Sequence, residues 1–168
     1  MRTLAAVKGG EARYVPPYPM EDTMATNGSD DALRELLGRR DQGVLATIKR
    51  DGRPQLSTVN HHYDDAARMI RVSITDGRAK TANIRRDPRV AFHVSSDDGW
   101  SYAVAEGTAQ LSAVATDLHD ATVEELIDVY RALGGEHPDW DEYRAAMVAD
   151  RRIVLRIPVD RVYGLSRG

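Results

Sequence analysis

Alternating apolar and polar positions predict five short strands in the first two thirds of the chain. In the third of these strands Ile70, Val72 and Ile74 share one face and polar residues occupy the other. The five strands are expected at residues 43–48, 55–63, 70–75, 90–94 and 100–111. Asp51-Gly52 between the first two is a strong signal for a two-residue hairpin. The strands are therefore expected to pair antiparallel with their neighbours in sequence.

Four segments have the spacing and end signals of helices. The first begins after Ser29, a favourable N-cap, and places leucines at helical spacing at positions 33, 36 and 37. The other three helices are expected at residues 78–86, 122–133 and 139–150. Two final strand signals, at 153–157 and 161–163, are separated by Pro158. Hairpin-linked strands followed by inserted helices favour an antiparallel barrel with a few helices, an α+β fold, and argue against a Rossmann sheet.

The first 28 residues differ from the rest of the chain. Prolines 16, 17 and 19 exclude a helix there, and no periodic apolar pattern follows before Gly28. We interpret residues 1–28 as a disordered extension, with Met24 as an alternative translation start, and residues 29–168 as one domain.

Composition excludes several classes of protein. The 168 residues include no cysteine, which rules out disulfides, thiolate metal sites and thiol catalysis. A net charge of −3 argues against a nucleic-acid-binding surface. No apolar run approaches the roughly 20 residues that span a bilayer, so no membrane association is expected. No signal segment opens the chain, and a cytoplasmic location is the default expectation.

The chain also lacks the common catalytic and nucleotide-binding motifs. It has no Gly-rich dinucleotide or phosphate loop, and no serine-hydrolase elbow. Its five histidines do not have metal-ligand spacing, and His61 and His62 are adjacent in an expected strand, where they would point to opposite faces. We therefore expect no bound metal. His62 remains able to line a pocket if its face turns inward.

The segment from Val72 to Thr81 carries the clearest chemistry. A strand ends, Gly77 turns the chain, and a helix begins with Arg78 and Lys80. A helix N-terminus with two cations suits a phosphate, and Ser73 can hydrogen-bond the same ligand. Further basic residues follow at positions 85, 86 and 89, so an acidic protein is locally basic here. The competing interpretation is a solvated helix face whose cations pair with nearby aspartates.

A second segment, Gly99 to Gly107, contains two large aromatic residues. Trp100 and Tyr102 would lie on the same side of a strand and could flank a flat ring. The alternative is that they belong to a core or dimer-interface cluster.

Taken together, these segments resemble the split β-barrel flavin-binding superfamily of pyridoxamine 5'-phosphate oxidase, and within it the actinobacterial branch that depends on the deazaflavin coenzyme F420. The resemblance covers the chain from about residue 30 to its end. The matching segments are Gly43–Ile48, Asp51–Gln55, Arg78–Thr81, Arg86–Pro88, Asp98–Gly107 and Val162–Gly164. The Trp-Ser-Tyr and Val-Tyr-Gly segments are the more specific to the deazaflavin branch.

The resemblance implies an antiparallel Greek-key split barrel that forms a homodimer, with two cofactor sites at the interface. Arg78 and Lys80, followed by Thr81, would bind the cofactor phosphate. Residues of the preceding strand, Val72 and Ser73, would border the ring system and ribityl chain. Ser57, Val59 and Asn60 would lie against the flat ring, and Trp100 and Tyr102 would come from the partner subunit. Arg85, Arg86 and Arg89 could attract the acidic polyglutamate tail of F420.

The resemblance also implies a reaction. The chain would be a reductase in which reduced deazaflavin donates a hydride from C5 to an electron-poor double bond or imine of a small molecule. Tyr63, His62 and Tyr102 are candidate proton donors, none of them fixed by a motif. Pyridoxamine phosphate oxidation is not expected, because the chain ends Tyr-Gly-Leu-Ser-Arg-Gly in place of an Arg-Leu-x-Pro-type segment. The alternatives are an FMN-dependent oxidoreductase on the same fold, and a non-enzymatic carrier of F420 or haem.

Overall fold

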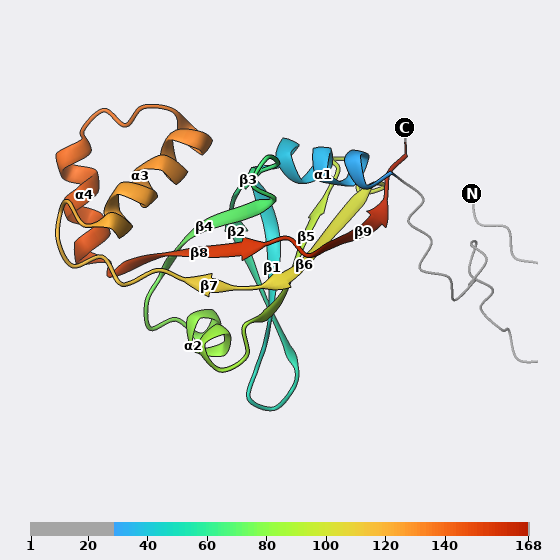
Figure 1. Ribbon diagram of the computed structural model, residues 1–168, viewed down its shortest axis with the longest axis horizontal. Helices are drawn as coiled ribbons and strands as arrows, with labels where there is room; N and C mark the ends of the chain where they lie inside the picture. Colours follow the sequence, from blue (N-terminus) through green and yellow to red (C-terminus); the bar gives the residue numbers. More distant parts are fainter. Residues whose placement is uncertain (1–28, 168) are drawn as a thin grey trace, which may run out of the picture.

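Two antiparallel sheets form the centre of the computed structural model, which describes residues 29–167 (Figure 1). The five-stranded sheet has the order β2-β1-β5-β6-β9 and the four-stranded sheet the order β3-β4-β8-β7. The strands are β1 Gln42–Ile48, β2 Pro54–Asn60, β3 His62–Asp64, β4 Met69–Thr75, β5 Arg89–Ser95, β6 Tyr102–Thr108, β7 Gln110–Leu111, β8 Arg152–Pro158 and β9 Arg161–Leu165. The helices are α1 Asp30–Arg39, α2 Ala79–Arg86, α3 Ala121–Gly134 and α4 Trp140–Ala149. The expected α+β fold of antiparallel strands with a few helices is therefore confirmed. The proposed extension at residues 1–28 lies outside the described residues.

Two of the expected strands are each divided between the two sheets. The predicted strand at 55–63 breaks at His61 into β2 and β3, and the one at 100–111 breaks at Ala109 into β6 and β7. The backbone amide of His61 donates to the carbonyl of Asp41 at 2.9 Å, and that of Ala109 to the carbonyl of Pro88 at 2.8 Å. The prediction of two continuous strands was wrong, because a period-two pattern does not record a change of sheet. These two crossings join the sheets around a shared core.

That core is built from the inward faces of both sheets. Phe92 is the largest fully buried side chain and packs with Leu45, Val72 and Leu155. Gly43 is required beside it, since a Cβ at this position would stand 2.3 Å from the Phe92 ring. The helix α1 lies across one end of the five-stranded sheet (Figure 1) and buries its leucines at 33 and 37.

The helices α3 and α4 follow β7 and precede β8 in the chain, and they form a separate pair. They stand at the left of Figure 1, beside the four-stranded sheet, and pack on it through Val154. Side-chain caps define where they begin, since the Asp120 carboxylate accepts from the amide of Val123 at 2.8 Å and Asp139 accepts from Glu142 at 3.0 Å. Among residues 29–167, no helix combines the length and apolar character needed to cross a membrane.

His61, at the crossing between the sheets, is a buried histidine that takes no part in the pocket described below. Its side chain is fully buried against the Phe92 ring, with the ring centroids 4.6 Å apart. Nε2 lies 3.1 Å from the carbonyl of Leu37, and Nδ1 has no hydrogen-bond partner in the described part of the chain. Burial lowers the pKa of His61 below its ordinary 6.5, so the native ring is neutral.

A pH dependence of stability follows from this burial. Between the lowered native pKa and 6.5 the unfolded chain binds a proton that the native chain does not, so stability falls as the pH drops through this range. We expect the free energy of unfolding, measured with urea from pH 7.5 to 5, to decrease by up to about 1.4 kcal/mol per pH unit. His61→Gln should flatten this slope. A slope that persists unchanged in the variant would assign it to other groups.

Candidate functional site

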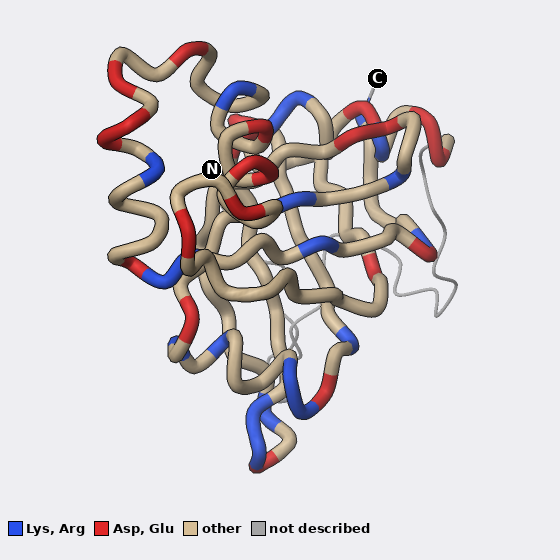
Figure 2. The backbone as a smooth tube through the Cα atoms, turned by 60° about the vertical axis from the view of Figure 1, so that its left-hand side comes forward, with Lys and Arg blue, Asp and Glu red and all other residues tan. Residues whose placement is uncertain are grey.

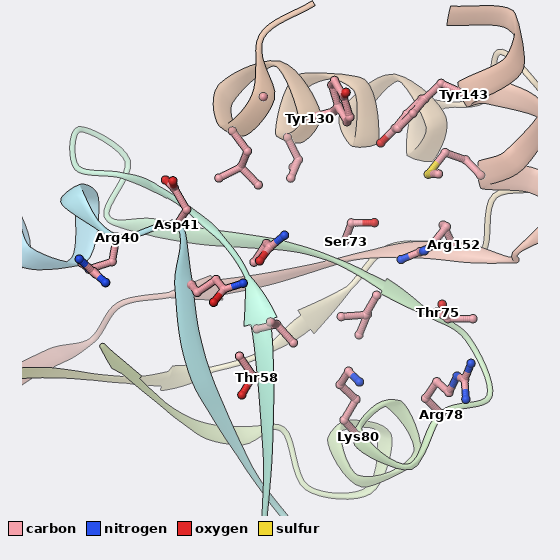
Figure 3. Close-up of a pocket in the computed structure, with 18 of the residues that line it drawn as sticks. Arg40, Asp41, Thr58, Ser73, Thr75, Arg78, Lys80, Tyr130, Tyr143 and Arg152 are labelled. Carbon is pink, nitrogen blue, oxygen red and sulfur yellow. The ribbon is translucent and has the colours of Figure 1, made fainter. Parts of the chain in front are cut away.

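The turn between β4 and α2 places two basic side chains at the mouth of a pocket. Gly77, with a φ of +77°, reverses the chain after β4, and Arg78 is the N-cap residue of α2. The buried hydroxyl of Thr81 donates to the carbonyl of Thr75 at 3.1 Å and fixes the start of the helix to the end of the strand. Arg78 and Lys80 then extend from α2 toward the pocket (Figure 3).

A buried polar contact fixes the far side of α2 to the β1–β2 hairpin. The side-chain amide of Asn83 donates to the Thr47 hydroxyl at 3.1 Å and to the Gln55 amide oxygen at 2.8 Å. Because buried amides are costly to leave unpaired, this contact sets the position of α2, and with it that of Arg78 and Lys80.

The pocket lies between β2, the end of β4, α2 and the α3–α4 pair (Figure 3), and has a volume of about 1090 Å³. That is slightly above the roughly 300–1,000 Å³ usual for drug-sized ligands, so it has room for a cofactor head group and a small substrate together. Polar and charged groups come from the end of α1 and the connection to β1, from the strands, and from the start of α2. They are Arg39, Arg40, Asp41, Gln42, Thr58, Asn60, Ser73, Thr75, Arg78, Lys80 and Arg152.

Most of the charge around this pocket is compensated within the chain. Arg39 pairs with Glu35, Arg40 with Asp97 at 2.6 Å, and Arg152 with Asp150 at 3.3 Å. Within residues 29–167, by contrast, neither Arg78 nor Lys80 has a carboxylate within 4 Å. The interpretation of these two as cations paired with aspartates is therefore wrong. They are available to an anionic ligand.

The basic residues that follow, on α2 and at the start of β5, are in a different situation. Arg85 pairs with Asp76 at 2.7 Å, Arg86 donates to the carbonyl of Ile48, and Arg89 pairs with Asp87 at 2.6 Å. The Arg89 side chain and backbone amide lower the pKa of Asp87 to about 2. The expectation that these three cations could attract an acidic tail stays a prediction, and each of them also has a partner within the chain. Basic residues do gather at the tip of the β1–β2 hairpin, at the bottom of Figure 2.

The sequence-predicted binding residues divide into two groups. Val59, Asn60, Ser73, Arg78 and Lys80 line this one pocket. Three others do not line it. Val72 is fully buried in the core on the opposite face of β4 from Ser73, Thr81 is buried with its hydroxyl bonded to Thr75, and Ser57 lies two residues before Val59 on β2.

Trp100 and Tyr102 lie apart from this pocket. Trp100 belongs to the turn before β6 and not to the strand, so the expectation that the two share a strand face is corrected. The side chains are 52% and 37% exposed, which excludes the core-cluster interpretation within one chain. The Arg167 guanidinium covers the Trp100 ring at 5.0 Å.

None of the three candidate proton donors lines the pocket. Tyr63 is buried in the middle of β3, where its hydroxyl donates to Asp65 at 3.1 Å, and burial and then Asp65 raise its pKa to about 12. His62 and Tyr102 lie outside the lining as well.

The structure instead brings Tyr130 and Tyr143 to the pocket, from α3 and α4. The sequence predicts the helices at 122–133 and 139–150 that carry these two residues, but neither tyrosine was assigned a role. One sequence feature could have indicated a role for Tyr130, namely the polar hydroxyl of a tyrosine among otherwise aliphatic residues on one face of a helix.

Comparison with known proteins identifies the family and the fold of this chain. Residues 29–166 match the family described as pyridoxamine 5'-phosphate oxidase, and the chain belongs to this family. Its fold is similar to that of several solved structures. A conserved hypothetical protein, Rv2991 from Mycobacterium tuberculosis, superimposes with a TM-score of 0.64 at 23% identity, over 83% of this chain and 85% of that one.

Two further proteins of similar structure are described by the cofactor that they use or bind. An F420 reductase superimposes with a TM-score of 0.59 at 22% identity, over 77% of this chain and 94% of that one. A FAD-binding protein from Mesorhizobium loti has a TM-score of 0.54 at 20% identity, over 77% and 87% of the two chains. At these identities the likeness establishes the split-barrel fold.

Proposed function

We propose that this protein is a coenzyme F420-dependent reductase of the split-barrel type. The observation that carries the proposal is the pair Arg78 and Lys80, two cations without carboxylate partners in the described chain that line one pocket with β2 and the end of β4. Membership of the pyridoxamine 5'-phosphate oxidase family and the fold shared with an F420 reductase support it.

The residues present fit a flat cofactor that carries a phosphate. Arg78 can hold phosphate oxygens with two parallel N–H donors, and Lys80 adds a point charge beside it. Ser73, on the preceding strand β4, lines the same pocket and can hydrogen-bond the ligand. Val59 and Asn60 belong to β2, which offers a strand edge against which a flat ring can lie. The free amides at the start of α2 add to the attraction for the anion.

The chemistry would be a hydride transfer followed by protonation. When bound, the reduced deazaflavin supplies a hydride from C5 to an electron-poor double bond or imine. The chain's own residues hold the phosphate, orient the ring along β2 and exclude water through the apolar side of α3 and α4.

A homodimer belongs to this proposal. Trp100 and Tyr102 expose large aromatic surface away from the pocket of their own chain, as expected for side chains that cover the site of a partner subunit. We propose that each subunit completes the other's pocket in this way.

The proposal is tested by comparing the affinities of the purified protein for F420 and for FMN. We expect F420, followed by its fluorescence, to bind at micromolar concentration or below and FMN to bind at least tenfold more weakly. An FMN-dependent oxidoreductase would give the reverse order. A haem carrier would give a Soret band on reconstitution, although in residues 29–167 no histidine lines the pocket to act as an axial ligand. Weak binding of F420 together with either of these results would refute the proposal.

A further inference from the structure

The α3–α4 side of the pocket is chemically unlike the side that carries the cations. Val129 and Met147 are buried there, and Leu133 is half-buried beside them. In Figure 3 these helices lie across the pocket from Arg78 and Lys80. We refer to Val129, Tyr130, Leu133, Tyr143 and Met147 as the helical wall. A surface of this composition favours contact with an apolar ligand.

Tyr130 contributes the available hydroxyl of the helical wall. The ring of Tyr130 is held by aromatic neighbours, with centroids 5.1 Å from Tyr143, 5.2 Å from His137 and 5.7 Å from Trp140. The Tyr143 hydroxyl is used within the fold, because it donates to the carbonyl of Leu126 at 3.0 Å. The Tyr130 hydroxyl makes no side-chain hydrogen bond within the part of the chain that the structure describes. A fixed ring with a free hydroxyl is suited to donate to a ligand.

The remaining charges determine what kind of ligand the helical wall can take. Once a phosphate occupies Arg78 and Lys80, the other basic groups of the pocket are those already paired with carboxylates. Asp41, at the β1 end of the pocket (Figure 3), has no basic group within 4 Å among residues 29–167. No uncompensated positive charge is then left for an anion. Asp41 lies outside the helical wall, which has no carboxylate of its own, so a cation held against the wall would lose its hydration without a partner there.

We propose that the helical wall binds the molecule that is reduced, and that this substrate is neutral, planar and largely apolar, with a hydrogen-bond acceptor for Tyr130. The inference rests on the proposed function, which assigns the two cations to the cofactor. Tyr130 is then a substrate-contacting residue that selects for an acceptor atom, and Leu133 selects against charge.

A matched pair of probes tests the charge preference without any cofactor. 2-Naphthamide is neutral and carries a carbonyl acceptor, whereas 2-naphthoate has nearly the same shape and a negative charge. Both are titrated by calorimetry into Arg78→Ala/Lys80→Ala protein, in which the cations that would attract any anion are absent. We expect 2-naphthamide to bind at least tenfold more tightly than 2-naphthoate. Equal binding of the two, or tighter binding of the anion, would overturn the inference.

Substitutions in the helical wall test where the probe binds. Tyr130→Phe should weaken 2-naphthamide about fivefold, as expected for one neutral hydrogen bond. Leu133→Glu should weaken it at least tenfold by placing a charge on the apolar surface. Tyr163→Phe and Leu118→Ala are matched controls outside the pocket, and should leave affinity unchanged. Melting curves show that each variant is folded.

The two proposals fail in distinguishable ways. Tight F420 binding combined with 2-naphthamide binding that neither Tyr130→Phe nor Leu133→Glu alters would overturn the helical wall as the substrate site and leave the cofactor assignment standing. If the protein does not bind F420, but binds 2-naphthamide in a way that Tyr130→Phe and Leu133→Glu weaken, the proposed function is refuted. The helical wall then remains a binding site for an apolar ligand.

Discussion

Replacing both Arg78 and Lys80 by alanine is expected to weaken F420 binding by more than a hundredfold. Each cation contributes a charge-assisted contact of about 1.5–3 kcal/mol to a phosphate, which corresponds to a roughly ten- to hundredfold loss for each single variant. Neither side chain is paired with a carboxylate in residues 29–167, so no internal contact is lost and the melting temperature should change little. Titration of cofactor fluorescence measures the affinities.

Arg85→Ala is the matched control for this experiment. Arg85 lies on the same helix, carries the same charge and is half-exposed, but its guanidinium pairs with Asp76. We expect this variant to bind F420 within about twofold of the original protein, since the loss of a paired surface charge has little effect. Equal losses in Arg85→Ala and in the double variant would mean that general electrostatic attraction holds the cofactor. Unchanged affinity in the double variant would remove the phosphate assignment.

Phe92→Ala should produce the largest loss of stability of any single substitution discussed here. Phe92 is fully buried between the sheets and packs against His61 and Leu45, so truncation leaves a cavity in the middle of the core. Such changes cost about 3–5 kcal/mol, which for a domain of this size lowers the melting temperature by about 10 °C or more.

Leu118→Ala provides the comparison for Phe92→Ala. Leu118 is 44% exposed, so its truncation should be nearly neutral. Thermal unfolding followed by circular dichroism compares the two variants. A melting temperature for Phe92→Ala within about 3 °C of the original would mean that the sheets close over the vacated space without penalty.

Local sequence signals were sufficient for most elements of the fold. The cap at Ser29 starts the first helix where the sequence predicts it, because capping depends on residues within one turn. The helices capped by Asp120 and Asp139 begin within one residue of their predicted starts, although these two caps were not predicted. The Asp51-Gly52 turn joins β1 to β2 as expected, with Gly52 at a φ of +82°. The prediction of a two-residue loop was wrong, because residues 49–53 separate the two strands and the amide of Lys49 donates to the carbonyl of Arg53 at 2.9 Å.

The errors in the fold prediction lie where tertiary structure decides. Nothing local distinguishes His61 or Ala109 from a residue in the middle of a strand, yet at both positions the chain moves to the other sheet. These crossings are determined by the closure of the core, which involves residues far apart in the sequence.

The candidate site was predictable only in part, for a similar reason. Arg78 and Lys80 follow a strand and a glycine turn, a local pattern that indicates an anion site directly. Whether a particular cation is free depends on carboxylates elsewhere, and the pairing of Arg85 with Asp76 is visible only in three dimensions. Tyr130 reaches the pocket because α3 packs beside β4 and β8, which helical spacing does not reveal.

The place of the α3–α4 pair in the chain has an evolutionary consequence. β7 and β8 are hydrogen-bonded neighbours, so the whole helical segment leaves and re-enters the sheet at adjacent points. Its length and sequence can therefore drift, or be exchanged between homologues, without disturbing the ladder that supports β4 and the phosphate-binding turn. Homologues with the same barrel could acquire new specificities through changes in the α3–α4 segment alone. Chimaeras that exchange this segment between homologues would be a direct way to alter specificity.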